Sequence, residues 1–346
     1  NDKVQNTVTY SKKIDWPVDN VAFCNAALDE ATMQYDGFRK TYTDPTKVPR
    51  SFSNGVTRFD PMLGWTTGFV AGSFWNLYEH NKNQTWLDTA TEWTKALEKN
   101  QYNRKTHDIG FIIYDSFGNG LRLTNNKAYE DVIVSAAKTL MERFNPQIGV
   151  TYSWSWGTWE FPVIIDNMMN LELLYRASEI TGDSVYRDAA ISHATITMEH
   201  HFRDDYSSFH LVNYDRETGK PNWKQTFQGI ADDSSWSRGQ GWGLYGYTMS
   251  YRFTRDEKFL EHAQGIYIQS DPDSGFVGGY GRALGLVWVN LGTPGIVYDH
   301  LNSDDEVASE KLIDLSGEIP ETQDQILPVE EEKTENKTER TTQHKR

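Results

Sequence analysis

The chain has 346 residues, with 34 Lys and Arg against 49 Asp and Glu, and its formal net charge is −15. This acidic balance, without a basic stripe, argues against a nucleic-acid partner. A single cysteine, Cys24, excludes an internal disulfide framework, and no run of about 18 apolar residues could span a membrane. Because the chain begins at Asn1, as a chain does after removal of an export signal, we expect a periplasmic or secreted protein, with the cytoplasm as the alternative.

Four copies of one turn signature follow a first helix that we expect at about Val18–Tyr35. Each copy opens with small polar residues that can cap a helix, and it places an aromatic residue sixth and an acid eighth. The residues on both sides of each copy have apolar side chains at helical spacing, so the repeated unit is a hairpin of two helices. The copies are Asn81–Asp88, Thr124–Asp131, Thr181–Asp188 and Thr254–Glu261.

Repeated helical hairpins form either an open solenoid or a toroid whose inner helices line a cavity. The copies are irregularly spaced, with long inserts, which favours an all-α toroid with elaborated loops at one mouth. Within one insert, Phe209–Asp215 and Pro221–Phe227 flank a turn and predict a short β-hairpin over the cavity. The pattern predicts about nine helices before Gln264.

The segments that open the four inner helices are rich in glycine, tryptophan and polar residues. Glycine inside a helix costs about 1 kcal/mol relative to alanine, so these clusters indicate close approach by another group, with crowding of neighbouring helices as the alternative. The 12 Trp, 18 Tyr and 16 Phe leave a similar choice, because aromatic rings stack on sugars and also fill cores. The segments are Gly64–Trp75, His107–Gly120, Phe161–Tyr175 and Ser234–Tyr247.

Asp166 is the first candidate for a catalytic group, because it lies in the apolar run Phe161–Met169. Burial favours the protonated form of a carboxyl group, which a general acid requires. The alternative is that Asp166 caps the helix that starts there. Asp108 precedes a glycine-rich turn on the preceding inner helix, so the two aspartates could form an acid and base pair.

Two other patterns do not indicate a binding site. His193, His200 and His201 lack the spacing of a metal site, so we expect structural histidines and no metal. The glycine-rich stretch Gly275–Gly285 lacks the order and the preceding strand of a nucleotide-binding loop.

Several motifs occur in the order found in one enzyme family: HDIGF, WSWGTW followed by IIDNMMNLELLY, FHLVNYD, TFQG and WSRGQGWGLYGYT. Over about residues 20–264 the chain resembles glycoside hydrolase family 88, the unsaturated glucuronyl hydrolases. The resemblance implies an all-α (α/α)6 barrel and a hydrolase that removes a 4,5-unsaturated uronic acid from the non-reducing end of lyase-generated oligosaccharides of the glycosaminoglycan type. It further implies acid-catalysed hydration of the C4=C5 double bond and no cofactor.

The resemblance also assigns individual residues. It makes Asp166 the general acid and base, and Asp108 the second aspartate, which positions the sugar and stabilises charge. Matching positions imply substrate contacts for His210, Gln228, Arg238, Trp242 and Thr226, whereas Trp65 and Trp156 either stack on sugar rings or pack in the core. The guanidinium of Arg238 suits sugar hydroxyls or a sulfate, and its alternative role is an ion pair with Asp232 or Asp233.

The chain departs from the family beyond about Gln264, where the late inner-helix segment of the family is missing. We therefore expect a catalytic barrel domain over residues 1–300, incomplete at its C-terminus, and a charged, disordered tail over 301–346. Two other functions stay open: a vestigial or carbohydrate-binding (α/α)6 protein, and an unsaturated rhamnogalacturonyl hydrolase. The oligomeric state is not predicted.

Overall fold

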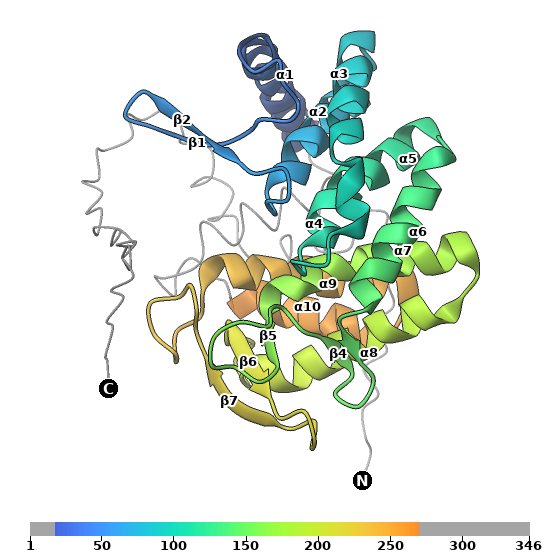
Figure 1. Ribbon diagram of the computed structural model, residues 1–346. Coiled ribbons are helices and arrows are strands. Elements are labelled where there is room, and N and C mark those ends of the chain that lie inside the picture. Colours follow the sequence, from blue (N-terminus) through green and yellow to red (C-terminus); the bar gives the residue numbers. More distant parts are fainter. Residues whose placement is uncertain (1–17, 270–346) are drawn as a thin grey trace, which may run out of the picture. The chain divides into compact units, whose positions relative to one another are not determined.

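The computed structural model describes residues 18–269 of the chain (Figure 1). If α4, the π-helical turn η2 and α5 are counted as one continuous segment, this part contains nine helices, as the sequence predicts. The predictions for Gly275–Gly285, for the 301–346 tail and for closure of the barrel lie outside the described residues. The helices are α1 Val18–Thr41, α2 Thr67–Asn81, α3 Gln84–Ala96, α4 Ile109–Ile113, η2 Tyr114–Gly118, α5 Asn119–Thr124, α6 Ala128–Met141, α7 Leu171–Thr181, α8 Ser184–His201, α9 Ser237–Thr254 and α10 Glu257–Gln269.

The four predicted turn signatures join the helices of four hairpins: α2 with α3, α5 with α6, α7 with α8, and α9 with α10. In every turn, the residue after the first helix adopts a left-handed backbone, and its N–H returns to a carbonyl of the last helical turn. The side chain of the next residue then accepts a hydrogen bond from the start of the second helix, as Asn83 does from the Thr85 N–H. The sixth-position aromatics are all buried: Trp86, Tyr129, Tyr186 and Phe259.

The hairpins stack side by side in chain order. Each inner helix contacts the next, α2 with α4, α4 with α7, and α7 with α9, and each outer helix packs against its inner partner. Large side chains such as Trp75, Tyr175 and Tyr247 are fully buried between these layers. The described part is therefore an α/α toroid segment of four hairpins preceded by α1.

The inner-helix glycines sit where neighbouring backbones meet. A Cβ on Gly68 would lie 2.2 Å from the carbonyl oxygen of Phe111, and one on Gly246 would lie 2.5 Å from Cβ of Met168. Crowding of neighbouring helices thus accounts for these glycines, and that alternative is confirmed for them.

Three small sheets accompany the helices. The predicted β-hairpin is confirmed: β6 pairs antiparallel with β7, and the short β5 pairs with the other edge of β6. A further hairpin, β1 with β2, turns at Asn54 and Gly55, both with positive φ. This Asn-Gly pair is a strong hairpin signal that our sequence analysis missed. The strands are β1 Val48–Ser53, β2 Val56–Asp60, β3 Phe144–Asn145, β4 Val150–Thr151, β5 Pro162–Ile164, β6 Leu211–Tyr214 and β7 Pro221–Gln225.

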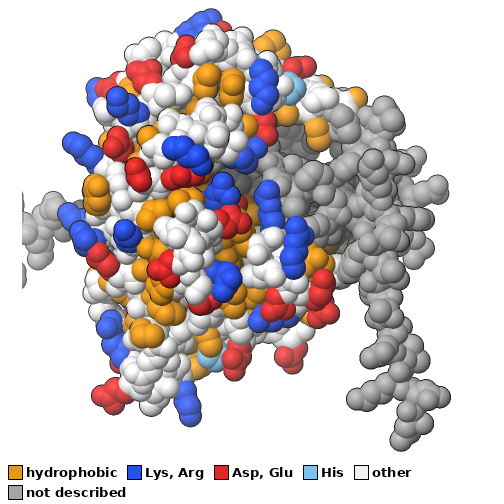
Figure 2. Space-filling model, turned by 90° about the vertical axis from the view of Figure 1, so that its right-hand side faces the viewer, with side chains coloured by type: hydrophobic (Ala, Val, Ile, Leu, Met, Phe, Trp, Pro, Cys, Tyr) orange, Lys and Arg blue, Asp and Glu red, His pale blue; other side chains and the backbone are white. Residues whose placement is uncertain are grey.

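The surface carries charges of both signs. On the face shown in Figure 2, the described Lys and Arg side chains are interspersed with Asp and Glu, and hydrophobic side chains gather between them. Among residues 18–269, no helix combines the length and the apolar character that crossing a membrane requires.

Candidate active site

An open pocket with a cavity volume of about 220 Å³ collects six of the nine residues predicted for the site. They come from the openings of inner helices and from the loops that follow β4 and β7. These six are Trp65, Asp108, Trp156, Asp166, Gln228 and Arg238. The other lining residues are Lys105, Thr106, His107, Ser153, Trp154, Ile164 and Phe227.

Asp166 lies in the 3₁₀ turn η3 (Ile165–Asn170), which leads into α7. Its carboxyl group does not cap a helix, because the capping position belongs to Ile164 and no side-chain cap is formed there. The capping alternative is therefore wrong. The side chain is 13% exposed and borders the pocket, and Oδ2 has no hydrogen-bond partner among the described residues. The Asp166 carboxyl group thus lies at the pocket wall with an oxygen that makes no hydrogen bond within the described residues.

His210 is fully buried behind Asp166, with its Nε2 atom 3.6 Å from Oδ2 of Asp166. The other ring nitrogen, Nδ1, accepts hydrogen bonds from the backbone N–H groups of Phe227 (2.8 Å) and Gln228 (3.1 Å). A nitrogen that accepts from two N–H groups carries no proton of its own, so the proton of neutral His210 lies on Nε2. His210 therefore presents a neutral N–H to Asp166.

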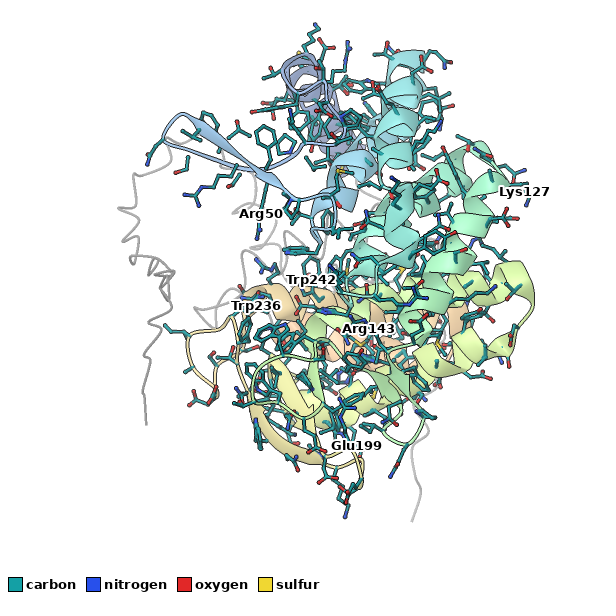
Figure 3. All side chains as sticks on the ribbon, viewed as in Figure 1. Arg50, Lys127, Arg143, Glu199, Trp236 and Trp242 are labelled. Atoms are coloured by element: carbon teal, nitrogen blue, oxygen red, sulfur yellow. The ribbon has the colours of Figure 1, made fainter. Side chains whose placement is uncertain are left out.

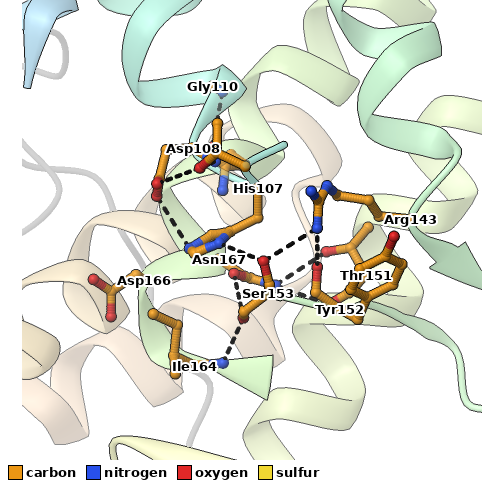
Figure 4. Close-up of polar contacts among 12 residues, drawn as sticks. His107, Asp108, Gly110, Arg143, Thr151, Tyr152, Ser153, Ile164, Asp166 and Asn167 are labelled. Atoms are coloured by element: carbon orange, nitrogen blue, oxygen red, sulfur yellow. Dashed lines mark hydrogen bonds and ion pairs between the residues drawn. The ribbon is translucent and has the colours of Figure 1, made fainter. Parts of the chain in front are cut away.

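Asp108 immediately precedes α4, the inner helix next to the turn that carries Asp166. Its Oδ2 accepts a 2.6 Å hydrogen bond from the hydroxyl of Thr106, and its Oδ1 lies 3.0 Å from Nε2 of His107. The prediction that the two aspartates lie on adjacent inner helices is confirmed, because α4 contacts η3 directly. Figure 4 shows Asp108 bound by its neighbours, whereas no dashed line ends on Asp166.

A buried polar network supports His107 from behind (Figure 4). The carbonyl of Ser153 accepts from Nδ1 of His107 at 2.9 Å and from Nη1 of Arg143 at 3.1 Å. The Ser153 hydroxyl donates to Oδ1 of Asn167, whose amide donates to the carbonyl of Thr151. Burial lowers the pKa of Arg143, and the two Nη atoms of its guanidinium donate to backbone carbonyls rather than to a carboxylate. The network fixes the ring of His107 before any ligand binds.

Arg238 occupies the first turn of α9 at the pocket wall. Its guanidinium lies over the ring of Trp236 at 4.4 Å and near that of Trp65 at 5.5 Å, and it donates a 2.8 Å hydrogen bond to Oε1 of Gln228. It makes no ion pair with a described carboxylate, so the alternative of pairing with Asp232 or Asp233 is wrong. Burial lowers the pKa of Arg238, and the charge of Asp166 partly opposes that effect.

One rim of the pocket is aromatic. The rings of Trp154 and Trp156 stack at 4.9 Å, and Trp159 and Phe227 contact both of them edge-on or tilted. Trp156 is 54% exposed although it lies in this cluster. An exposed indole supported from behind by a stacked one is suited to hold a sugar ring.

Three predicted residues lie outside the lining. His210 acts from behind Asp166, as described above. Thr226 accepts from the Gly229 N–H and so shapes the loop that carries Gln228. Trp242 is buried and packs on Phe111 with ring centroids 5.2 Å apart. In Figure 3, Trp236 and Trp242 lie toward the middle of the described part, whereas Lys127 and Glu199 lie at its periphery.

Sequence reasoning missed His107, Thr106 and Trp154 as site residues. The signal for His107 and Trp154 was present, because both lie inside the motifs HDIGF and WSWGTW. Of the other histidines, His193 and His201 are buried in the fold, and burial lowers the pKa of each to about 3. Within residues 18–269, no group of three or more His, Cys, Asp or Glu side chains is arranged to hold a metal ion.

Comparisons with known proteins identify the family of this chain. Residues 44–264 match the model of Glycosyl Hydrolase Family 88. The chain is 46% identical over 221 residues to an unsaturated glucuronyl hydrolase of Formosa agariphila, an alignment that covers 62% of this chain and 55% of that protein. It is 34% identical over 235 residues to an unsaturated chondroitin disaccharide hydrolase of Streptococcus agalactiae, with 66% of this chain and 58% of that protein covered.

Solved structures give the same result. The crystal structure of an unsaturated glucuronyl hydrolase specific for heparin superposes with a TM-score of 0.69 at 44% identity, over 72% of this chain and 67% of that one. A Streptococcus agalactiae unsaturated glucuronyl hydrolase superposes with a TM-score of 0.65 at 28% identity, over 77% of this chain and 71% of that one. The chain spans little more than half the length of the curated relatives described above. On its motifs, its site and its fold of the (α/α)6-barrel type, the chain belongs to glycoside hydrolase family 88.

Proposed function

We propose that this chain removes the 4,5-unsaturated uronic acid from the non-reducing end of oligosaccharides that polysaccharide lyases have produced. One observation carries the proposal: Asp108 and Asp166, from the openings of two neighbouring inner helices, border the same pocket in different surroundings. Two carboxyl groups in different environments can take separate roles in acid and base chemistry.

The proposed reaction is hydration of the C4=C5 double bond. The carboxyl group of Asp166 donates its proton to C4, which leaves positive charge shared between C5 and the ring oxygen. A water molecule adds to C5 and returns a proton to Asp166, so the acid is regenerated. The hemiketal at C5 then collapses and releases the neighbouring sugar. Unlike a retaining glycosidase, this route needs no covalent glycosyl intermediate.

The rest of the pocket suits an anionic sugar. Lys105 and Arg238 supply positive charge to a pocket that also holds the two aspartates, and Arg238 can engage hydroxyl or sulfate oxygens through its planar fork. Trp156 offers a supported face to the sugar next to the uronate. Relatives named for chondroitin disaccharides and for heparin support a glycosaminoglycan-type substrate.

The test follows the near-ultraviolet absorbance of the conjugated double bond in unsaturated chondroitin and heparin disaccharides. We expect absorbance to fall with the parent protein and with Asp131→Asn, a surface variant on the outer helix α6, but not with Asp166→Asn. Circular dichroism would establish that all three proteins are folded.

Other outcomes would favour the alternatives. Binding of the disaccharides without consumption by any folded protein would contradict the proposal and favour a vestigial, carbohydrate-binding protein. Consumption of unsaturated rhamnogalacturonan disaccharides alone would favour the rhamnogalacturonyl activity. Location outside the cytoplasm also stays a proposal, which cell fractionation would test.

A further inference from the structure

Arg50 lies at a break in the pairing of the β1–β2 hairpin. The register shifts between Pro49 and Ser51, so the residue between them, Arg50, is the extra residue of a β-bulge. A bulge re-aims the side chain that it carries, and bulges are over-represented next to active sites. In Figure 3, Arg50 lies on the side of the hairpin that faces Trp236. The bulge thus directs an arginine toward the start of α9, where Arg238 borders the pocket.

The guanidinium of Arg50 is held from the hairpin side by a buried carboxylate. Its Nη1 atom donates to Oδ1 of Asp60 at 3.0 Å, and the side chain of Asp60 is 3% exposed, whereas that of Arg50 is 53% exposed. Oδ2 of Asp60 accepts from the hydroxyl of Thr66, the residue that follows Trp65 of the pocket. The ion pair therefore buries its carboxylate and leaves the guanidinium accessible to a ligand.

The charges of Arg50 and Arg238 act on the same region. Burial lowers the pKa of Arg238, the charge of Asp166 opposes that effect, and the positive charge of Arg50 adds to it. Within residues 18–269, Arg50 donates only through Nη1, and Arg238 donates only through Nη2, to Gln228. A guanidinium has five N–H groups, so both arginines retain donors for a ligand. Two such cations that sense each other's charge are suited to an anionic group with several oxygens.

We propose that Arg50 and Arg238 form a binding site for a sulfate group of the substrate, with Arg50 as a specificity-determining residue. The inference rests on the proposed function, because the unsaturated disaccharide carries the sulfate. A sulfate ester is anionic at neutral pH and presents several terminal oxygens, which two planar guanidinium groups can bind together. The uncharged hydroxyl of an unsulfated disaccharide gains much less from a second arginine.

Binding can be measured without turnover in the Asp166→Asn protein, which lacks the proposed acid. Titration calorimetry compares the unsulfated unsaturated chondroitin disaccharide with its monosulfated forms, modified at O-2 of the uronate or at O-4 or O-6 of the hexosamine. We expect a monosulfated form to bind about tenfold more tightly than the unsulfated one, and the form that does so locates the sulfate. Adding Arg50→Gln should abolish this preference without changing the affinity for the unsulfated disaccharide.

Two further variants serve as controls in the same Asp166→Asn protein. Arg58→Gln removes an exposed arginine from β2 of the same hairpin and should leave the sulfate preference unchanged. Arg50→Lys retains a positive charge for Asp60 but loses the planar fork, so it should keep only part of the preference. Circular dichroism would establish that every variant is folded.

The outcomes separate this inference from the proposed function. Equal affinities for all the disaccharides, with consumption of the double bond by the parent protein, would overturn the sulfate site and leave the hydrolase standing. A sulfate preference that depends on Arg50, in a chain that consumes no disaccharide, would support the site and contradict the hydrolase. An equal loss of affinity for every disaccharide in Arg50→Gln would show that Arg50 serves the hairpin alone and would overturn the proposal.

Discussion

The backbone N–H of Gly110 donates a 2.8 Å hydrogen bond to Oδ1 of Asn170, and this bond ties the helix that follows Asp108 to the turn that carries Asp166. The contact is possible only because Gly110 has no side chain. A Cβ at this position would lie 2.5 Å from Cα of Asn170, a backbone atom that cannot rotate away. The relative position of the two aspartates thus depends on a single glycine.

We expect Gly110→Ala to lower the free energy of unfolding by about 3 kcal/mol, because overpacking forces the backbones of α4 and η3 apart. Substrate turnover should fall more than stability alone explains. Gly37→Ala is the matched control: Gly37 also lies in a helix, has no atom within 4 Å of an added Cβ, and should gain about 1 kcal/mol. Thermal and urea unfolding measure both changes, and equal effects of the two substitutions would contradict the argument.

The hairpins of this fold could be predicted from sequence because their turns are local. A left-handed residue, a capping side chain and a buried aromatic within eight residues determine each turn, and none of these needs a distant partner. The β1–β2 hairpin was equally local and was missed only because its Asn54–Gly55 signal was passed over.

The site was predictable in its composition but not in its hydrogen bonding. The motifs identified Asp108 and Asp166, and the order of the hairpins placed them on adjacent inner helices. The tautomer of His107 could not be predicted, because it is set by the carbonyl of Ser153, 46 residues along the chain. Trp242 shows the converse: its motif implies a sugar contact, whereas its ring is packed against Phe111.

Even a conservative replacement of Arg238 should weaken substrate binding. Lysine retains the positive charge at this position, but it loses the planar contact with Trp236 and the fork that reaches Gln228. We expect Arg238→Lys to raise KM for unsaturated disaccharides about tenfold with a smaller change in kcat. Arg187→Lys, on the exposed side of α8, is the control and should leave steady-state kinetics unchanged. A fall in kcat with unchanged KM would instead assign Arg238 to the chemical step.

Glu172 is buried in the first turn of α7, and burial raises its pKa. Burial also raises the pKa of Asp115 well above its usual value, with a further contribution from Glu172. For an acid whose folded-state pKa is raised, stability is present at low pH and is lost as pH rises past the unfolded value. Glu172→Gln can still accept the hydrogen bond from the Tyr245 hydroxyl without becoming charged.

We therefore expect Glu172→Gln to gain about 1 to 2 kcal/mol over the parent between pH 4 and pH 7 in urea unfolding. Glu79→Gln removes an exposed partner of Arg122 and should change stability by less than about 1 kcal/mol at either pH. A variant less stable than the parent at pH 7 would mean that the fold requires the carboxylate of Glu172.

The buried histidines predict how the fold responds to acid. Burial lowers the pKa of His193 from 6.5 to about 3, so the unfolded chain binds a proton at mildly acidic pH that the folded chain excludes. This contribution to stability is fully present above about pH 6.5 and is lost as pH falls toward 3; between pH 7 and pH 5 it amounts to about 2 kcal/mol.

His193→Asn retains an acceptor for the Thr151 N–H but does not titrate. We expect the variant to be less stable than the parent at pH 7 and to lose about 2 kcal/mol less than the parent on acidification to pH 5, as measured by urea unfolding. His80→Asn is the control, because His80 contacts the exposed Asp29 and is not enclosed in the core, so its removal should not flatten the acid response. Parallel stability profiles for the parent and His193→Asn would show that His193 is already protonated, or solvated, in the folded chain.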